Sequence, residues 1–256
     1  MMEQQAQKIE RRQCDVLVIG GGPAGSTVAP MLADKGHRVV MLEKAHHPRF
    51  HIGESLLPAN LPLFERMGIA EEVKAIGMLK PGAEFVSPNH DMSSVFCFAE
   101  AWDKSMPSAY QVLRSEFDEI LIRNAERKGA HVVEGCKVTG VDLDSNPDQI
   151  QATALHDDGS KSQWTARFLV DASGRDTFLA NRFQIKHRNP RHNSSAMYAH
   201  FAGARRHQRR PVRHAPLPEL RRRAHRPVLR AMRAEEGRAH GWQHGAQGGL
   251  GALSVV

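Results

Sequence analysis

Short apolar runs alternate with helical patterns near the start of the chain. Residues 15–19 read as a buried strand, residues 23–35 as a helix that stops at Gly36, and residues 38–43 as a second strand. We expect a kink at Pro30, because a proline inside a helix removes a backbone hydrogen bond. A strand–helix–strand order of this kind is typical of a parallel sheet, so the pattern predicts an α/β fold.

The middle of the chain adds more strands and one long helix. The helix spans residues 115–128 and has an apolar stripe, with Ser115 and Asp118 in the spacing of a capping box. An Asp-Asp-Gly turn at 157–159 predicts a hairpin. The remaining elements are helical segments at 55–67 and 70–76 and strands at 83–87, 95–98, 109–113, 131–134, 137–143, 150–156, 167–170 and 196–202, of which 83–87, 95–98 and 109–113 are expected in a second layer.

Glycines follow the first strand in the spacing G-x-G-x-x-G. Gly20 allows a tight turn, Gly22 lets the backbone approach a pyrophosphate, and Gly25 lets the helix pack close to the strand. The N-terminus of the following helix attracts an anion. Glu43 ends the second strand, where a ribose-binding acid belongs, so the sequence predicts a dinucleotide site.

Composition separates the body of the chain from its last residues. The chain has 256 residues, 41% hydrophobic and 25% charged, which is ordinary for a soluble globular protein. It has three widely spaced cysteines, no apolar run long enough to span a membrane and no signal-peptide core. These features predict a cytoplasmic protein without disulfides and with no membrane partner.

The segment 204–256 is unlike the rest. It holds 12 Arg and 3 Glu with no Lys or Asp, a net charge of +9, whereas the whole chain carries +7. It has few branched apolar residues, so we expect it to be disordered. Two interpretations remain: a basic arm that binds nucleic acid, against which only Trp242 could stack on bases, or GC-rich DNA read out of frame after a frameshift near 203–206.

Four motifs together resemble the flavin-dependent halogenases, a group of the FAD-dependent aromatic monooxygenases. They are the Gly20–Gly25 turn with Glu43, the segment Pro-Arg-Phe-His-Ile-Gly-Glu-Ser-Leu-Leu-Pro at 48–58, Lys-Pro-Gly-Ala-Glu-Phe at 80–85, and a pair shared with flavin hydroxylases at 110–118 and 171–174. The resemblance covers residues 12–203. It implies a Rossmann-type FAD-binding domain with a parallel sheet and an added mixed β layer, as in glutathione-reductase-like flavoproteins, including part of the substrate-domain strands.

The resemblance also implies a reaction and a site. Reduced FAD from a separate flavin reductase would react with oxygen to a peroxyflavin, which oxidises chloride or bromide to hypohalous acid, and Lys80 would pass the halogen to a phenolic or pyrrolic substrate, free or bound to a carrier protein. No metal is implied. The implied FAD-binding residues are Gly20, Gly22, Pro23, Ala24, Gly25, Glu43, Lys44, Arg49, Gly53, Glu54, Ser55, Arg114, Asp171 and Gly174.

Each of these residues also has a plain structural interpretation. Lys80 and Arg114 could be surface charges, Glu54 and Ser55 could cap the next helix, and Asp171 could be a turn residue. The three histidines at 46, 47 and 51 are interpreted as a solvated loop rather than metal ligands, since no carboxylate or cysteine spacing accompanies them.

The family's downstream Trp-x-Trp-x-Ile-Pro motif and its later Gly-Asp segment are absent, so a truncated and inactive chain is one expectation. Two alternatives to a halogenase stay open. One is an FAD-dependent hydroxylase or reductase, which would not need Lys80. The other is a non-catalytic FAD-binding fragment whose basic tail binds nucleic acid in a salt-dependent manner.

Overall fold

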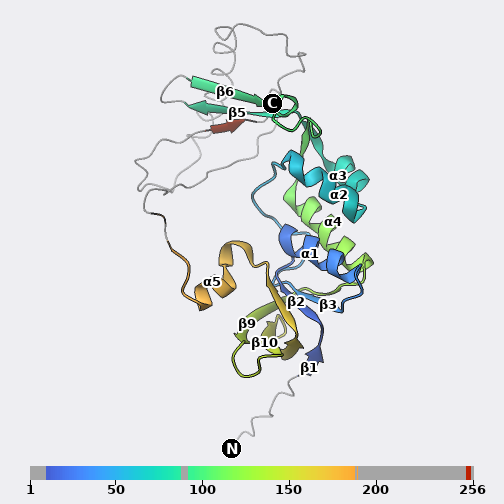
Figure 1. Cartoon of the computed structure of the whole chain (residues 1–256), viewed down its shortest axis with the longest axis vertical. Coiled ribbons are helices and arrows are strands. Elements are labelled where there is room, and N and C mark those ends of the chain that lie inside the picture. Colours follow the sequence, from blue (N-terminus) through green and yellow to red (C-terminus); the bar gives the residue numbers. More distant parts are fainter. Residues whose placement is uncertain (1–9, 88–91, 188, 190–251, 255–256) are drawn as a thin grey trace, which may run out of the picture. The chain divides into compact units, whose positions relative to one another are not determined.

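The structure, a computed structural model, describes residues 10–87, 92–187, 189 and 252–254 (Figure 1). They belong to two compact units. The first unit takes the chain up to Leu79 and then Tyr110–His187, and the second takes Lys80–Ala109 with the described residues beyond position 187.

A four-stranded parallel sheet forms the first layer of the larger unit. Its order is β12-β2-β3-β8, and every neighbouring pair is parallel. The strands are β2 (Val16–Ile19), β3 (Val39–Leu42), β8 (His131–Val133) and β12 (Phe168–Asp171). Helix α1 (Pro23–Ala33) connects β2 to β3, and α4 (Arg114–Arg127) precedes β8. The predicted α/β fold with a parallel sheet is confirmed.

A second sheet of mixed direction packs on one face of the parallel sheet. Its order is β1-β11-β10-β9, with β1 parallel to β11 and the other pairs antiparallel. The strands are β1 (Glu10–Gln13), β9 (Cys136–Asp142), β10 (Ile150–His156) and β11 (Lys161–Ala166), and the predicted hairpin turn joins β10 to β11 with Gly159 at φ +81°. The added mixed layer is confirmed, although β1 and β11 were not predicted because their sequences are largely polar.

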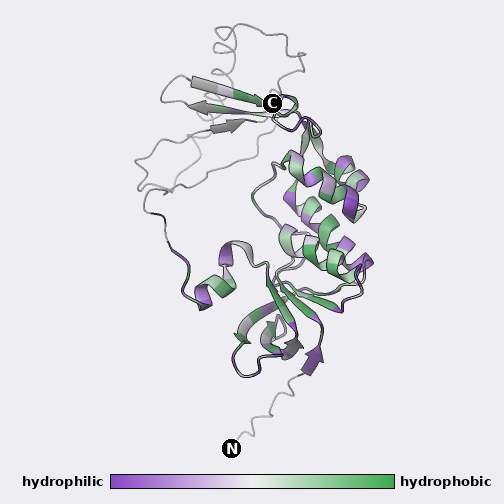
Figure 2. Ribbon diagram, viewed as in Figure 1, coloured by the Kyte–Doolittle hydropathy of each residue, from purple (hydrophilic) through white to green (hydrophobic). Residues whose placement is uncertain are grey.

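Alternate residues of β2 and β3 supply two separate cores. Leu17 and Leu42 pack against the mixed sheet, around the buried Trp164. Val18 and Met41 pack on the opposite face against α1 and α4. All residues of the two strands are buried, which explains their uninterrupted apolar runs (Figures 1 and 2).

Short helices extend the helical layer. They are the 3-10 turn η1 (Pro58–Asn60), α2 (Leu61–Met67) and α3 (Ala70–Ile76), followed by β4 (Met78–Lys80), which pairs with β7 (Ala109–Gln111). Phe64 of α2 meets Phe117 of α4 edge to face, with ring centroids 5.6 Å apart. A third apolar core thus joins these helices to α4. Beyond β12 come the turn η3 (Gly174–Asp176) and α5 (Phe178–Arg182).

The smaller unit contains β5 (Gly82–Ser87), β6 (Met92–Cys97), the 3-10 turn η2 (Phe98–Glu100) and β13 (Ala252–Ser254). Strand β5 pairs antiparallel with β6 and with β13. The strands expected at 83–87 and 95–98 therefore exist, but in this separate sheet rather than in the second layer. The strand expected at 196–202 and the boundary at 203–204 lie outside the described residues.

One local prediction has a clear outcome. The capping box at Ser115 and Asp118 is wrong: α4 begins at Arg114 after Leu113, which makes no side-chain cap, and the Asp118 carboxylate binds Arg114 instead. Helix α1 runs on across Pro30. No helix in the described part of the chain is long and apolar enough to cross a membrane.

The contact between α1 and the end of β2 depends on glycine. A Cβ at Gly25 would lie 1.9 Å from the Gly20 carbonyl oxygen and 3.3 Å from the Ala172 Cβ. Gly20 has φ +101°, and a Cβ there would lie 2.6 Å from the Ala172 carbonyl oxygen. The backbone leaves no room for a side chain at either position, so α1 can pack this closely only with glycine at both.

We predict that Gly25→Ala lowers the free energy of unfolding by about 3 kcal/mol, because the clash is with backbone that cannot move aside. Chemical denaturation measures the loss. Gly140→Ala is the matched control, since a Cβ there meets nothing within 4 Å, and its stability should stay within about 0.5 kcal/mol of the parent chain. Equal stability of Gly25→Ala and Gly140→Ala would contradict the packing argument.

A second prediction concerns the start of the parallel sheet. Asp15 accepts hydrogen bonds from the Arg38 side chain (2.9 Å) and main-chain N–H (2.8 Å), which lower its pKa from 3.8 to about 2. This contribution is present above pH 3.8 and is lost as the pH falls through about 2. Asp15→Asn should therefore be less stable than the parent at pH 7, and the difference should shrink below pH 4.

Thermal unfolding between pH 7 and about 2 measures both curves. Arg38→Met removes the side-chain donor but keeps the main-chain N–H bond to Asp15. Its stability gap from the parent should therefore be smaller than that of Asp15→Asn and shrink over the same pH range. A stability gap that stays constant over this pH range would rule out the ion pair as its source.

Candidate functional site

The carboxyl ends of β2 and β12 meet where the strand order reverses, because β3 and β8 continue from β2 in one direction and β12 lies in the other. In open α/β sheets ligands bind in the crevice at such a point. Gly20 follows β2 and Ala172 follows β12, and their backbones are in contact. The structure thus brings the predicted glycine turn and the predicted Asp171–Gly174 turn together.

Gly22 differs from its neighbouring glycines. A Cβ at Gly22 would meet only the Arg49 Nη2 atom, at an ordinary distance of 3.7 Å. Packing within the described chain therefore does not demand glycine here. The open space lies at the first turn of α1, where Pro23 has no N–H and the N–H groups of Ala24 and Gly25 have no acceptor within the helix. These are features of an anion site.

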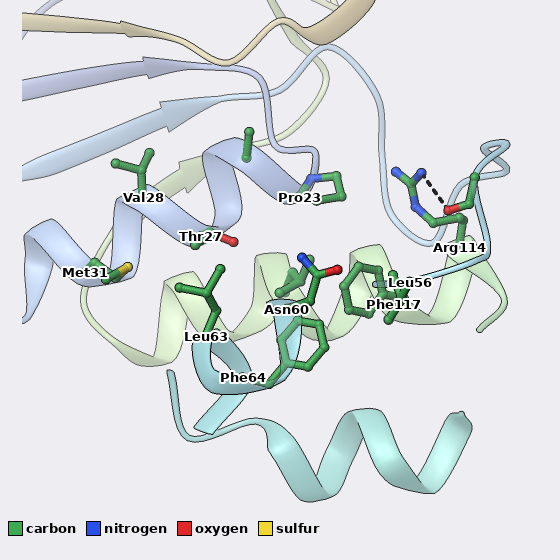
Figure 3. A pocket seen from close by; sticks show the side chains of 13 residues that line it. Pro23, Thr27, Val28, Met31, Leu56, Asn60, Leu63, Phe64, Arg114 and Phe117 are labelled. Carbon is green, nitrogen blue, oxygen red and sulfur yellow. Dashed lines mark hydrogen bonds between the residues drawn. The ribbon is translucent and has the colours of Figure 1, made fainter. Parts of the chain in front are cut away.

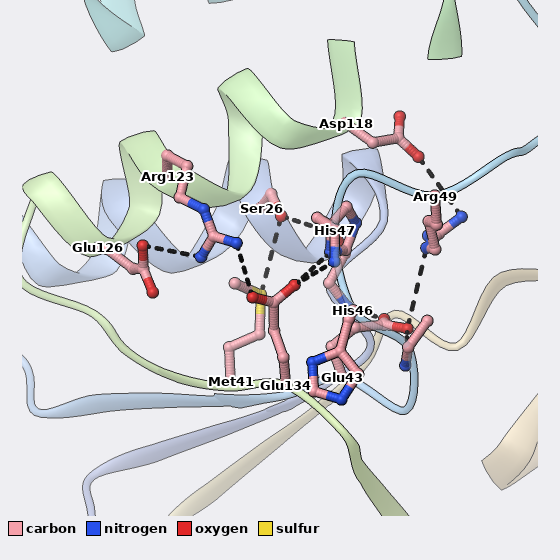
Figure 4. A network of polar contacts seen from close by, with 12 residues as sticks. Ser26, Met41, Glu43, His46, His47, Arg49, Asp118, Arg123, Glu126 and Glu134 are labelled. Carbon is pink, nitrogen blue, oxygen red and sulfur yellow. Dashed lines mark hydrogen bonds and ion pairs between the residues drawn. The ribbon is translucent and has the colours of Figure 1, made fainter. Parts of the chain in front are cut away.

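Arg49 stands beside this space with an unused donor. Its guanidinium lies between two carboxylates, with Nε 4.0 Å from Glu43 Oε1 and Nη1 3.6 Å from Asp118 Oδ2 (Figure 4). Its Nε is buried and has no hydrogen-bond partner in the described part of the chain. The atom that borders the space at Gly22 is Nη2 of the same guanidinium, and a guanidinium N–H next to an open helix N-terminus fits a phosphate oxygen.

Glu43 holds the glycine turn in place. Its Oε2 accepts a hydrogen bond from the Gly21 N–H at 2.5 Å and its Oε1 from the Ala45 N–H at 2.9 Å. The side chain is almost fully buried at the end of β3. Each carboxylate oxygen can accept a second hydrogen bond, so this arrangement leaves capacity for a ribose hydroxyl. Lys44, the next residue, binds the Asp176 carboxylate.

The loop with the Gly-Glu-Ser segment is fastened to α4 and β7. Gly53 has φ +102°, and the Arg114 Nη1 donates to the Ile52 carbonyl oxygen at 2.8 Å. The Glu54 carbonyl oxygen accepts from the Val112 N–H at 2.9 Å, and Ser55 forms a bridge with Gln111. Neither Glu54 nor Ser55 lies in the first turn of a regular helix, since η1 begins at Pro58.

Arg114 fastens the loop at Ile52 to helix α4. Its Nε and Nη2 donate to the two oxygens of the fully buried Asp118, at 2.7 and 2.9 Å. Together with the bond to Ile52, these contacts tie α4 to the loop. The surface-charge interpretation of Arg114 is therefore wrong, because the residue is 8% exposed.

Asp171 organises the turn after β12. Its Oδ1 accepts from the Ser173 N–H at 3.0 Å and its Oδ2 from the Leu179 N–H at 2.8 Å, at the start of α5. Burial alone would raise the pKa of Asp171, but these hydrogen bonds outweigh it and hold the pKa below its usual value. Gly174 follows with φ +63°. The turn interpretation of Asp171 agrees with these contacts.

A cavity of about 500 Å³ lies beside the N-terminal half of α1. Its walls come from α1, α2, α4 and the Gly-Glu-Ser loop and are mostly apolar (Figure 3). Pro23, Ala24, Gly53 and Arg114 are the predicted site residues in the wall. The other lining residues are Thr27, Val28, Met31, Leu56, Asn60, Leu63, Phe64, Phe117 and Leu121.

Lys80 ends β4 at the start of the smaller unit. It is 2% exposed, and burial lowers the pKa of its amine. Its Nζ lies 5.1 Å from the centre of the Phe98 ring. The interpretation of Lys80 as a solvated surface lysine is therefore wrong. A desolvated amine of lowered pKa is a stronger hydrogen-bond donor to a bound partner and a better nucleophile than a solvated one.

The sequence did not single out two residues of the larger unit, Gln111 and His47. Gln111 has a buried Oε1 without a hydrogen-bond partner among the described residues, beside the Ser55 bridge. The motif at 110–118 covers Gln111, but the FAD-binding residues it implies include only Arg114. His47 was interpreted as part of a solvated loop, yet its side chain is fully buried and bonded to Glu134. Of its neighbours, His46 is exposed and paired with Asp157.

Comparisons with known proteins agree with this geometry. Residues 13–246 match the family described as FAD binding domain. The flavin-dependent halogenase armH3 of Armillaria mellea is 37% identical over 75% of this chain and 39% of its own length. The 1H-pyrrole-2-carbonyl-[peptidyl-carrier protein] chlorinase of Pseudomonas fluorescens is 33% identical over 73% of this chain and 45% of its own length.

A solved structure gives the same result. The myxobacterial chondrochloren halogenase CndH, an FAD-dependent halogenase, is 39% identical and superposes with a TM-score of 0.59 over 65% of this chain and 38% of its own. The chain thus spans less than half of the length of each relative named here. With the family match, the parallel sheet and the glycine turn in agreement, the chain belongs to the FAD-binding-domain family, and it is similar to the flavin-dependent halogenases within it.

Proposed function

We propose that this chain binds FAD at the glycine turn and is part of a flavin-dependent halogenase. The enzyme would chlorinate or brominate an aromatic substrate, phenolic or pyrrolic. The observation that carries the proposal is the open space at Gly22 between the first turn of α1 and the Nη2 atom of the Arg49 guanidinium. A pyrophosphate would accept hydrogen bonds from the Ala24 and Gly25 N–H groups, and the positive charge of Arg49 would attract it.

The remaining site residues have roles that follow from their positions. Glu43 would accept a ribose hydroxyl while it keeps the turn closed through Gly21. Arg114 would hold the Gly53 loop at the cavity wall. Reduced FAD, supplied by a separate flavin reductase, would provide two electrons that reduce oxygen to the peroxide level, and the peroxide would then oxidise the halide to hypohalous acid. The carrier-bound pyrrole of the Pseudomonas fluorescens relative makes a carrier-bound substrate one candidate here.

Lys80 would direct the halogen to the substrate. Its burial excludes water, and its lowered pKa raises the fraction of neutral amine available for hydrogen bonding to a hypohalous acid or for reaction with it. A flavin hydroxylase has no use for such a lysine. The buried Lys80 therefore favours halogenation over the hydroxylase alternative.

We predict that Gly22→Ala separates cofactor binding from folding. The new Cβ would clash with no protein atom. The free energy of unfolding of the variant should fall by no more than about 1 kcal/mol, because alanine is only slightly less favourable than glycine at a helix N-cap. The same methyl group would block the approach of a phosphate, so FAD affinity should fall at least about tenfold, the cost of one charge-assisted hydrogen bond. Fluorescence titration with FAD measures the affinity.

The matched control for this experiment is again Gly140→Ala, which lies in strand β9 away from the turn and should bind FAD like the parent chain. Unchanged FAD affinity in Gly22→Ala would show that the cofactor does not use this turn.

We predict that Lys80→Met abolishes halogenation but not FAD binding. The assay combines the chain with a flavin reductase, NADH, FAD, bromide and a phenol or pyrrole, and mass spectrometry detects the product. Loss of a proton-donating or nucleophilic group should reduce product at least about 100-fold. Lys104→Met, which changes an exposed lysine of the same unit, is the control and should keep activity.

Halogenated product from Lys80→Met at the parent rate would remove Lys80 from the reaction. Hydroxylated rather than halogenated product from the parent chain would favour the hydroxylase alternative. A parent chain that binds FAD and forms neither product would limit the proposal to cofactor binding.

A further inference from the structure

A chain of polar contacts that begins at the buried His47 links the loop after β3 to helix α4. His47 lies in this loop with its side chain fully enclosed. Its Nδ1 is 2.7 Å from Glu134 Oε1, and its main-chain N–H donates to the same oxygen at 2.7 Å (Figure 4). The loop is therefore attached to the end of β8 by two hydrogen bonds at one residue.

Glu134 carries the connection onward. Its Oε2 accepts from the Arg123 Nη2 at 2.7 Å, and Arg123 in turn reaches Glu126 at 3.1 Å within α4. Burial would raise the pKa of Glu134, but the hydrogen bonds from Arg123 and His47 outweigh it and hold the pKa below its usual value, so Glu134 is ionised at neutral pH. An ionised acceptor makes both links strong.

Only one of the two ring nitrogens of His47 has a hydrogen-bond partner among the described residues. Its Nε2 is buried and has no hydrogen-bond partner in the described part of the chain, which is unfavourable for a polar atom. A purely apolar side chain could fill the same space without that penalty. Packing alone therefore gives histidine no advantage over an apolar side chain at position 47. Any stabilisation specific to histidine must come from its hydrogen bond to Glu134.

Arg49 is the side chain that depends on this attachment. It follows His47 by two residues, and its contacts with Glu43 and Asp118, at 4.0 and 3.6 Å, are longer than hydrogen bonds. These contacts attract the guanidinium from both sides without fixing it. The position of the loop backbone therefore decides whether Arg49 faces Gly22.

We propose that His47 is a positioning residue of the cofactor site: bonded to Glu134, it holds the loop so that the Arg49 guanidinium faces the space at Gly22 where the FAD pyrophosphate binds. This inference rests on the proposed FAD binding. It means that FAD binding requires, besides the glycine turn and Glu43, an intact link from the loop to α4.

The test is a double-mutant cycle on FAD affinity in the full chain. His47→Phe keeps a ring but removes the Nδ1 bond, and FAD affinity should fall about tenfold because Arg49 loses its orientation. His47→Asn offers an amide donor in place of Nδ1 and should recover most of the affinity. His46→Asn, at the exposed neighbouring histidine, is the matched control and should bind like the parent chain.

The decisive arm is the Arg49→Met background. If His47 acts through Arg49, His47→Phe causes no further loss of FAD affinity once Arg49 is gone. An equal loss in both backgrounds, or no loss from His47→Phe in the parent, overturns the inference. If His47→Phe does not fold, as judged by circular dichroism, Glu134→Leu, which removes the acceptor of both His47 hydrogen bonds, replaces it in the same cycle with the same expected results.

The cycle also separates this inference from the proposed function. A parent chain that does not bind FAD overturns both. A parent chain that binds FAD, with His47→Phe and Arg49→Met acting independently, overturns only the role of His47.

Discussion

The close backbone contact between α1 and the end of β2 is the constraint on which the rest of the site depends. With no side chain at Gly25, the helix rests on the Gly20 carbonyl, and its first turn comes to lie at the edge of the parallel sheet. That placement directs the unpaired N–H groups of the first turn into the crevice beside β12. Glu43 and Arg49 then converge on the same turn from the end of β3, so a single steric condition collects the anion-binding groups.

Ionised side chains in this unit fix loops, and this explains why several predicted cofactor residues already have protein partners. Glu43 bonds two main-chain N–H groups, Asp171 bonds two more, and Arg114 spans Asp118 and the Ile52 carbonyl. Arg49 is the exception, since its contacts with Glu43 and Asp118, at 4.0 and 3.6 Å, are longer than hydrogen bonds. The protein's own contacts thus organise these loops, and Arg49 Nη2 borders the space at Gly22.

The sequence predicted the parallel sheet and the glycine turn because these features are local: an apolar run, a glycine spacing and an acid at the next strand end. It did not predict β1 and β11, whose polar residues form strands only because neighbouring strands offer them hydrogen-bond partners. The sequence pattern also did not predict the burial of His47, because its partner Glu134 lies 87 residues away along the chain. The spacing of Asp118 from Ser115 predicts a helix cap, whereas in the structure its carboxylate accepts two hydrogen bonds from Arg114 and lies 3.6 Å from Arg49 Nη1.

The most direct test of the central claim is the structure of this chain determined with FAD. We predict that the pyrophosphate occupies the space at Gly22, with its oxygens accepting hydrogen bonds from the Ala24 and Gly25 N–H groups and from the Arg49 guanidinium. A pyrophosphate bound elsewhere, with this space unfilled, would contradict the assignment of the cofactor site to the glycine turn.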